Sequence, residues 1–274
     1  MDALMNGSDG TRTVETVAPV DGVFDFRHAR FFTKPYMETF YRDKPPTNDE
    51  RVVLEFLVDQ LARLDRRAVV LEVGCGPTVH HVLPFVPYAY EVHMADYLPE
   101  NLEEVRRWRD SAAGAYQWDQ YTRLVLDLEQ RQTSPAAIHE RESQARALVC
   151  QLLPCDLKTT HILAQPITYE VVSAFYCTEE VGIDIGAWET VIANLCRTVA
   201  PGGMLYLSCL RNTDYYMVGG TRFPCACISE EDLRRVLPEL GFDMSQSVVE
   251  GVAVEHQEDK GVVGVVLVAA RKKR

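Results

Sequence analysis

Long apolar segments are missing from this sequence. A membrane-spanning helix needs about 20 consecutive apolar residues, and no stretch approaches that length. The first residues, MDALMNGSDGTRTVETV, contain no apolar signal segment. We therefore expect no membrane partner and a cytoplasmic location.

Positive charge is also scarce. Lys and Arg total 28 against 40 Asp and Glu, which gives a formal net charge of −12 at pH 7. An acidic surface repels phosphate groups, so nucleic acid and anionic membranes are poor candidates for partners. The basic residues 271–274 are too few to reverse this balance. We expect no nucleic-acid partner.

Paired cysteine spacings typical of zinc sites are absent, although the chain has eight cysteines. A chain of 274 residues can bury a core without disulfides, and several of the cysteines lie in apolar runs. Cys225 and Cys227 are therefore expected to pack rather than to react. The adjacent His80 and His81 point about 100° apart on a helix, so we expect no metal site there.

The chain reads as a single folded domain with a distinct N-terminal part. Residues 1–22 are polar without periodicity, and we expect them to be disordered. Residues 23–46 are rich in aromatic side chains and interrupted by prolines, which predicts short helices. This segment is either a lid over a site or an arm that only covers the core. Residues 23–274 would form one domain.

Apolar patterns alternate between strand and helix along that domain. Strands are predicted at 69–73, 91–95, 147–156, 167–177, 204–210, 247–257 and 261–273. Helices are predicted at 51–65, 78–87, from 101 onward, at 136–147, 186–200 and 229–241. Such alternation predicts an α/β fold, a doubly wound and mostly parallel seven-stranded sheet that an antiparallel hairpin closes.

The most informative stretch is Val69–Thr78, an apolar run that ends in a glycine turn. Gly74 and Gly76 allow the backbone to approach a ligand closely. The third glycine of the dinucleotide motif G-x-G-x-x-G is absent, and no GK[ST] sequence exists to cradle phosphates. Glu72 lies inside the apolar run and needs a partner, which a ligand or a backbone amide would supply.

A second acid fits the same ligand. Asp96 ends the next predicted strand, 22 residues after Gly74, where a carboxylate accepts hydrogen bonds from ribose hydroxyls. A glycine turn with such an acid, but without phosphate motifs, favours a nucleoside that lacks phosphates. S-adenosylmethionine is a ligand of this kind, and an NAD-dependent dehydrogenase is disfavoured.

Longer motifs then carry a specific resemblance. They are GCGPT, DYLPENLEEVRRW, GAYQWDQYTRLVLDLE, LLPCD, APGG, DYYMVGGTRFPC and ARKK. With these motifs, in order from about Tyr36 to Lys273, the chain resembles the small-molecule N-methyltransferase family that contains nicotinamide, phenylethanolamine, indolethylamine and thioether methyltransferases. The resemblance implies a Rossmann-like class I methyltransferase fold with an N-terminal helical lid.

The resemblance also implies which residues bind S-adenosylmethionine. Two tyrosines would close over it, the glycine turn would line its methionine part, Asp96 would hold the ribose, and Asp156 with Leu157 would meet the adenine edge. The implied residues are Tyr36, Tyr41, Gly74, Gly76, Thr78, Asp96, Tyr97, Asn101, Asp156, Leu157 and Phe175.

The acceptor side departs from the family pattern. The residues at the matching positions are Thr178, Cys209, Thr213, Tyr216 and Cys225. Thr178 stands where the resemblance implies an acid that meets the substrate amine, and Cys209 replaces a second acid of the family pattern. Glu179, Glu180 and Tyr36 are our candidates for catalysis, the two acids for handling a proton. If neither acid handles a proton, Glu179 and Glu180 belong to a solvated acidic loop. Tyr215 and Tyr216 form either an aromatic wall around a cation or the edge of the core.

Together these features predict a monomeric enzyme that methylates a small molecule with S-adenosylmethionine. N-methylation of an amine or a heteroaromatic nitrogen is the first expectation, because the resemblance is to N-methyltransferases. Methylation of oxygen or sulfur, and cofactor binding without catalysis, stay open.

Overall fold

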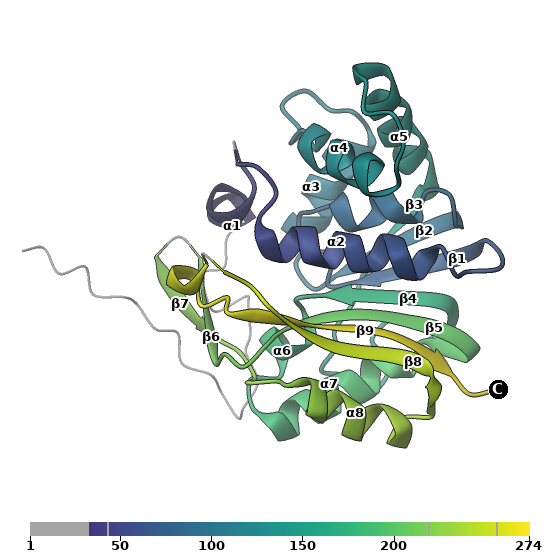
Figure 1. The fold of residues 1–274 in the computed structure, drawn as a ribbon, viewed down its shortest axis with the longest axis vertical. Coiled ribbons are helices and arrows are strands. Elements are labelled where there is room, and N and C mark those ends of the chain that lie inside the picture. The colour runs from purple at the N-terminus through teal and green to yellow at the C-terminus, as the bar shows by residue number, and fades with distance from the viewer. Residues whose placement is uncertain (1–32, 43, 219, 256) are drawn as a thin grey trace, which may run out of the picture.

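The computed structural model describes residues 33–42, 44–218, 220–255 and 257–274 (Figure 1). Its main element is a seven-stranded sheet with the strand order β3-β2-β1-β4-β5-β9-β8. These strands are β1 (Ala68–Val73), β2 (Ala89–Asp96), β3 (Val149–Pro154), β4 (Tyr169–Phe175), β5 (Val199–Leu210), β8 (Phe242–Ala253) and β9 (Gly264–Lys272). The first five strands pair in parallel, whereas β9 pairs antiparallel with both β5 and β8. The expected mostly parallel sheet with an antiparallel closing hairpin is confirmed.

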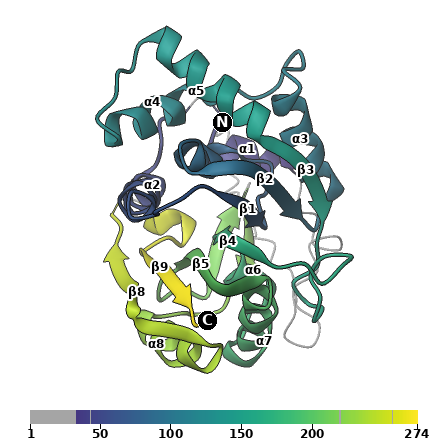
Figure 2. The same cartoon turned by 90° about the vertical axis from the view of Figure 1, so that its right-hand side faces the viewer.

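Helices cover both faces of this sheet (Figures 1 and 2). They are α1 (Thr33–Phe40), α2 (Asn48–Leu61), α3 (Pro99–Arg109), α4 (Asp119–Leu128), α5 (Pro135–Leu148), α6 (Thr178–Val181), α7 (Ile185–Cys196) and α8 (Glu230–Glu239). Side chains of α2 to α5 share one apolar core with the sheet, and those of α7 and α8 share a second core on the other face. A capping box formed by Ser229 and Asp232 begins α8.

Three local details differ from the sequence predictions. The segment His80–Phe85, within the helix predicted at 78–87, is a 3-10 helix that contains Pro84. Helix α3 begins at Pro99 rather than at residue 101, and its Glu103 and Glu104 pair with Arg106 and Arg107 at i,i+3. A further short hairpin, β6 (Tyr215–Val218) with β7 (Thr221–Pro224), was not predicted because each strand has only four residues.

The strand order creates the edge at which ligands bind in such sheets. Chain order runs from β1 outward through β2 to β3, then returns to β4 on the other side of β1. The crossover connections therefore diverge between β1 and β4, and a crevice forms at the carboxyl ends of these strands. Gly74, directly after β1, lies in this crevice.

The N-terminal predictions are only partly covered by the described residues. The expected disorder of 1–22 and the first part of the segment 23–46 lie outside them. Within the described ranges, α1 and Tyr41 pack against the domain, and none of the helices there has the length and apolar character to cross a bilayer.

Candidate functional site

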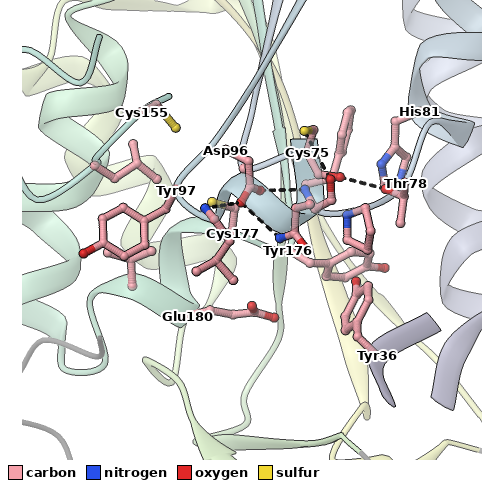
Figure 3. Close-up of a pocket in the computed structure, with 18 of the residues that line it drawn as sticks. Tyr36, Cys75, Thr78, His81, Asp96, Tyr97, Cys155, Tyr176, Cys177 and Glu180 are labelled. Carbon is pink, nitrogen blue, oxygen red and sulfur yellow. Dashed lines mark hydrogen bonds between the residues drawn. The ribbon is translucent and has the colours of Figure 1, made fainter. Parts of the chain in front are cut away.

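A pocket of about 870 Å³, counting its open mouth, lies at the carboxyl edge of β1, β2, β3 and β4 (Figure 3). Every residue predicted to bind the cofactor lines it. Those residues are Tyr36, Tyr41, Gly74, Gly76, Thr78, Asp96, Tyr97, Asn101, Asp156, Leu157 and Phe175. Segments that are 139 residues apart in sequence, from Tyr36 to Phe175, thus meet around one cavity.

The glycine turn needs both of its glycines, for different reasons. Both have positive φ, +67° at Gly74 and +59° at Gly76, where a side chain is strained. A Cβ at Gly74 would come within 2.0 Å of the Cys177 sulfur, so Gly74 permits β1 and the β4 loop to pack closely. A Cβ at Gly76 would meet no protein atom within 4 Å. Since Gly76 lines the pocket, that space belongs to the ligand cradle.

Asp96 is held by three donors at the end of β2. Its Oδ2 accepts a hydrogen bond from the Gly76 amide at 2.8 Å. Its Oδ1 accepts from the Leu98 amide at 2.8 Å and from Asn101 at 3.0 Å. Burial raises the pKa of Asp96, and these hydrogen bonds limit the rise. The Asp96 carboxylate also lines the pocket, where a ligand hydroxyl could meet it.

The far end of the pocket suits a flat, partly polar ring. The Lys158 ammonium lies 4.4 Å from the centre of the Tyr97 ring and 3.2 Å from its hydroxyl. Asp156 Oδ1 accepts a hydrogen bond from the Lys158 amide, which leaves Oδ2 for an amino group. Leu157 is buried beside them. The set combines an aromatic face, an apolar wall and a carboxylate, as adenine requires.

Tyr36 on α1 and Tyr41 just after this helix lie at the opposite end of the pocket. The hydroxyls of Tyr36 and Tyr41 are 3.4 Å apart, and Tyr41 donates a 2.9 Å hydrogen bond to Glu50. Tyr41 also packs against the rings of His80 and Trp118. These contacts attach α1 to the body of the domain at the mouth of the pocket.

His80 and His81 do converge on one partner, so the expectation that they point apart is wrong. His80 Nε2 is 2.8 Å and His81 Nε2 3.2 Å from the same Glu50 oxygen, and the two rings are 3.9 Å apart. The Glu50 carboxylate on α2 contacts both rings. The 2.8 Å separation between His80 Nε2 and Glu50 Oε2 is a hydrogen bond.

The two imidazoles have opposite charge preferences. Burial lowers the pKa of His80 to about 4. Burial acts in the same direction on His81, but the carboxylates of Glu50 and Glu72 outweigh it and raise the pKa of His81 to about 9. His81 Nδ1 lies 3.7 Å from Glu72 Oε1. The partner of Glu72 is therefore an imidazolium that lines the pocket, rather than a backbone amide.

Glu179 and Glu180 are adjacent in sequence but face different surroundings. Glu179 is fully buried outside the pocket, and its carboxylate accepts a 2.7 Å hydrogen bond from the Leu210 amide. Burial raises the pKa of Glu179 to about 7. Glu180 lines the pocket together with Tyr36 (Figure 3). Burial, followed by the charge of Glu179, raises the pKa of Glu180 well above its usual range.

None of the five predicted substrate residues lines this pocket. Thr178 and Cys209 are buried and contact each other at 3.4 Å, and Thr178 also accepts a hydrogen bond from the Trp188 ring. The Cys225 thiol donates a 3.5 Å hydrogen bond to the Thr213 carbonyl. These residues thus contact one another rather than the pocket.

Tyr216 lies near the pocket residue Glu180, because burial and then the charge of Glu180 raise the pKa of Tyr216. It belongs to an apolar cluster with Phe223 and Cys225, against which Tyr36 and Tyr176 pack. Since Tyr36 and Tyr176 also line the pocket, this cluster adjoins it.

Several pocket residues were missed from the sequence. Tyr176 lines the pocket with a φ of +48°, a backbone strain that is uncommon for a bulky residue and that clusters at functional sites. His81, Cys155, Cys177 and Lys158 line it as well. A position next to a strand end could have identified three of them from the sequence, since Cys155, Tyr176 and Cys177 directly follow β3 or β4.

Comparison with known proteins decides the family. A family model described as the NNMT/PNMT/TEMT family matches residues 24–273. The chain belongs to this family. It is 26% identical over 221 residues to the nicotinamide N-methyltransferase of Sus scrofa, covering 78% of this chain and 83% of that protein. It is 25% identical over 227 residues to the indolethylamine N-methyltransferase of Oryctolagus cuniculus, covering 79% and 84%.

Membership of the NNMT/PNMT/TEMT family confirms three predictions. The family itself, an S-adenosylmethionine-dependent methyltransferase activity and S-adenosylmethionine as the cofactor are those expected from the sequence. The residues present fit this cofactor, because the open space at Gly76, the Asp96 carboxylate and the ring-binding end line one continuous pocket.

Solved structures agree on the fold. The Burkholderia thailandensis 1,6-didemethyltoxoflavin-N1-methyltransferase, with bound 1,6-didemethyltoxoflavin and S-adenosylhomocysteine, superposes with a TM-score of 0.52 at 18% identity, covering 98% of this chain and 99% of that chain. The magnesium protoporphyrin IX methyltransferase of Synechocystis PCC 6803 with bound S-adenosylmethionine gives a TM-score of 0.52 at 13% identity, covering 87% and 90%. The class I methyltransferase fold is thereby confirmed.

Proposed function

We propose that this enzyme of the NNMT/PNMT/TEMT family methylates the nitrogen of a small amine or heteroaromatic compound. The observation that carries the proposal is the position of Glu180. It is an acid within the pocket, between Tyr36 and the apolar cluster around Tyr216. A carboxyl group beside aromatic rings suits a nitrogen compound that arrives as a cation.

Each group of cofactor-binding residues would contact a different part of S-adenosylmethionine. Asp96 and Asn101 would hold the ribose hydroxyls, and Tyr97, Asp156 and Leu157 would hold adenine. The glycine turn, Gly74 to Thr78, with Phe175, Tyr36 and Tyr41, would surround the methionine part. His81, a cation below this end of the pocket, would attract the cofactor carboxylate.

Bound S-adenosylmethionine supplies an electrophilic methyl group, which a nitrogen lone pair takes as the carbon–sulfur bond breaks. The protein has to align the nitrogen, exclude water and remove its proton. Glu180 would accept this proton, because an environment that raises its pKa makes its carboxylate a stronger base. Tyr36, which lies close enough for Glu180 to raise its pKa, would orient the acceptor ring.

Glu180 would thus replace the two family acids that this chain lacks. Thr178 and Cys209, at those two positions, are in contact with each other in the core. Glu179 would have a structural role, since its carboxylate holds the Leu210 amide. We further propose that α1 and the residue that follows it act as a lid, because Tyr36 and Tyr41 line the pocket and Tyr41 anchors this segment to the body.

We infer further that the protein is a cytoplasmic monomer that does not bind nucleic acid. All eight cysteines are unpaired, which suits a reducing compartment. The net charge of −12 opposes phosphate binding. Size-exclusion chromatography with light scattering tests the monomer, and a dimer mass would overturn it.

The function is tested with labelled S-adenosylmethionine and a panel of amines, pyridines, phenols and thioethers. Transfer to nitrogen compounds, with little transfer to phenols or thioethers, is the expected result. Transfer to oxygen or sulfur acceptors would replace the proposal with another methylation chemistry. Cofactor binding without transfer to any acceptor would favour a binding protein.

A further inference from the structure

A second cluster of chemically active side chains lies on the sheet, away from the cofactor pocket. Glu91 and His93 are on β2, and Cys150 is on β3, the strand at the edge of the sheet (Figure 2). One ligand atom from each, a carboxylate oxygen, an imidazole nitrogen and a thiol sulfur, lies within 4.8 Å of the other two. None of the three residues lines the cofactor pocket.

The pleat of β2 explains why two of these residues share a face. Val92 and Met94 point into the core that α2 to α5 cover. Since side chains alternate along a strand, Glu91 and His93 point to the opposite face. Glu91 and Cys150 are exposed, whereas His93 is mostly buried. The cluster is therefore held on one side by the sheet and open to solvent on the other.

The separations within the cluster are those between ligands around a metal. His93 Nε2 is 3.3 Å from Glu91 Oε2, and Cys150 Sγ is 3.5 Å from the same oxygen. Zinc bonds of about 2.0–2.1 Å to nitrogen and oxygen and about 2.3 Å to sulfur, arranged tetrahedrally, place N and O about 3.3 Å apart and S and O about 3.5 Å apart. The Glu50–His80 contact of 2.8 Å is too short for this arrangement.

The second nitrogen of His93 is also placed as in metal sites. Its Nδ1 lies 2.9 Å from the hydroxyl of Tyr169 on β4. Metal-bound histidines commonly donate this second N–H to an acceptor, which fixes the ring and leaves the other nitrogen for the metal. Tyr169 holds the His93 ring in this way, with Nε2 directed at Glu91.

We propose that Glu91, His93 and Cys150 form a zinc-binding site that joins β2 to the edge strand β3. The combination of carboxylate, imidazole and thiolate is one that zinc accepts, and three protein ligands leave a fourth position for water. The Cys150 thiol releases its proton to solvent on binding. His93 precedes Asp96 by three residues, about 10 Å along the strand, so this metal does not reach the cofactor pocket.

Titration of the reduced, metal-free full chain with Co²⁺ tests the site. A thiolate-to-cobalt charge-transfer band that saturates at one equivalent, and that Zn²⁺ abolishes, is the expected result. Cys150→Ser and His93→Asn should lose the band. Cys227→Ser, which changes the other exposed cysteine, should keep it. Tyr169→Phe should weaken binding about 10-fold, because it removes the hydrogen bond to His93.

Two results would overturn the proposal. One is the absence of the band in the unaltered chain, and the other is its persistence in Cys150→Ser, which would indicate adventitious binding to other thiols. Circular dichroism checks that each variant is folded. As an independent readout, Zn²⁺ should raise the melting temperature of the unaltered chain but not that of Cys150→Ser.

Discussion

Tyr41 donates a 2.9 Å hydrogen bond to Glu50 and thereby ties the segment that follows α1 to the first turn of α2. The same carboxylate contacts His80 and His81. Glu50 is therefore the point at which the proposed lid meets the polar network below the pocket.

Tyr41→Phe should lower both the stability and the cofactor affinity of the protein. The change leaves a buried Glu50 oxygen without its donor, which costs about 1–3 kcal/mol in free energy of unfolding. Urea unfolding and calorimetry with S-adenosylhomocysteine measure the two effects. Tyr36→Phe is the comparison variant for stability, because the Tyr36 hydroxyl lies 3.4 Å from that of Tyr41, whereas the 2.9 Å hydrogen bond to Glu50 comes from Tyr41. Equal stability of the two variants would contradict this role of Tyr41.

His81 should make stability depend on pH in the alkaline range. Its pKa is raised from 6.5 to about 9 on folding, so it stabilises the folded state fully below pH 6.5. This stabilisation is lost as the pH rises through 9, and amounts to about 3 kcal/mol. The test is the difference in free energy of unfolding between the unaltered chain and His81→Gln at pH 6 and pH 9.5. A difference that is the same at both pH values would contradict the prediction.

Alanine substitutions at the two glycines of the turn should have different effects on stability and on cofactor binding. Both put a side chain at positive φ, which costs about 1–2 kcal/mol. Gly74→Ala also drives a Cβ into Cys177 and should destabilise the fold markedly. Gly76→Ala meets open space in the pocket, so its main effect should be weaker cofactor binding. Thermal melts and calorimetry distinguish these outcomes, and equal loss of stability in both variants would refute the distinction.

Asp96→Asn should weaken binding of S-adenosylhomocysteine. The side-chain NH2 of asparagine is a donor, and it would face the backbone N–H donors of Gly76 or Leu98. The substitution also removes the negative charge that would meet a ribose hydroxyl. Hydrogen bonds to a charged group are worth about 1.5–3 kcal/mol, so the expected loss is about 10-fold to 100-fold. Asp59→Asn, an exposed change on α2, is the control and should bind normally. Unchanged affinity of Asp96→Asn would remove Asp96 from the cofactor site.

The cofactor-binding part of the site could be predicted from the sequence because it is built from residues at the ends of the predicted strands. The residues at the carboxyl ends of β1, β2, β3 and β4 must converge at one edge of a parallel sheet, and Gly74, Asp96, Asp156 and Phe175 do so. Apolar periodicity likewise predicted each strand of the main sheet. These features depend on local pattern and on topology, both of which a single sequence contains.

The remaining features depend on contacts that no local pattern contains. His80 and His81 meet because Glu50, from another helix, draws both rings. The different surroundings of Glu179 and Glu180 arise from one turn of α6, which buries the first side chain against Leu210 and directs the second into the pocket. Adjacent acids in a polar sequence give no sign of such a difference.

The most direct test of the account is the pH dependence of kcat/KM for methyl transfer, measured for Glu180→Gln, Glu179→Gln and the unaltered enzyme with the best acceptor of the panel. Glu180 must lose its proton to act as a base, so kcat/KM should rise with pH through its raised pKa. Glu180→Gln should remove this rise and lower kcat by about 100-fold to 10,000-fold. Glu179→Gln should keep the rise, because its carboxylate lies outside the pocket. An unchanged profile and rate in Glu180→Gln would contradict the central claim that Glu180 handles the acceptor proton.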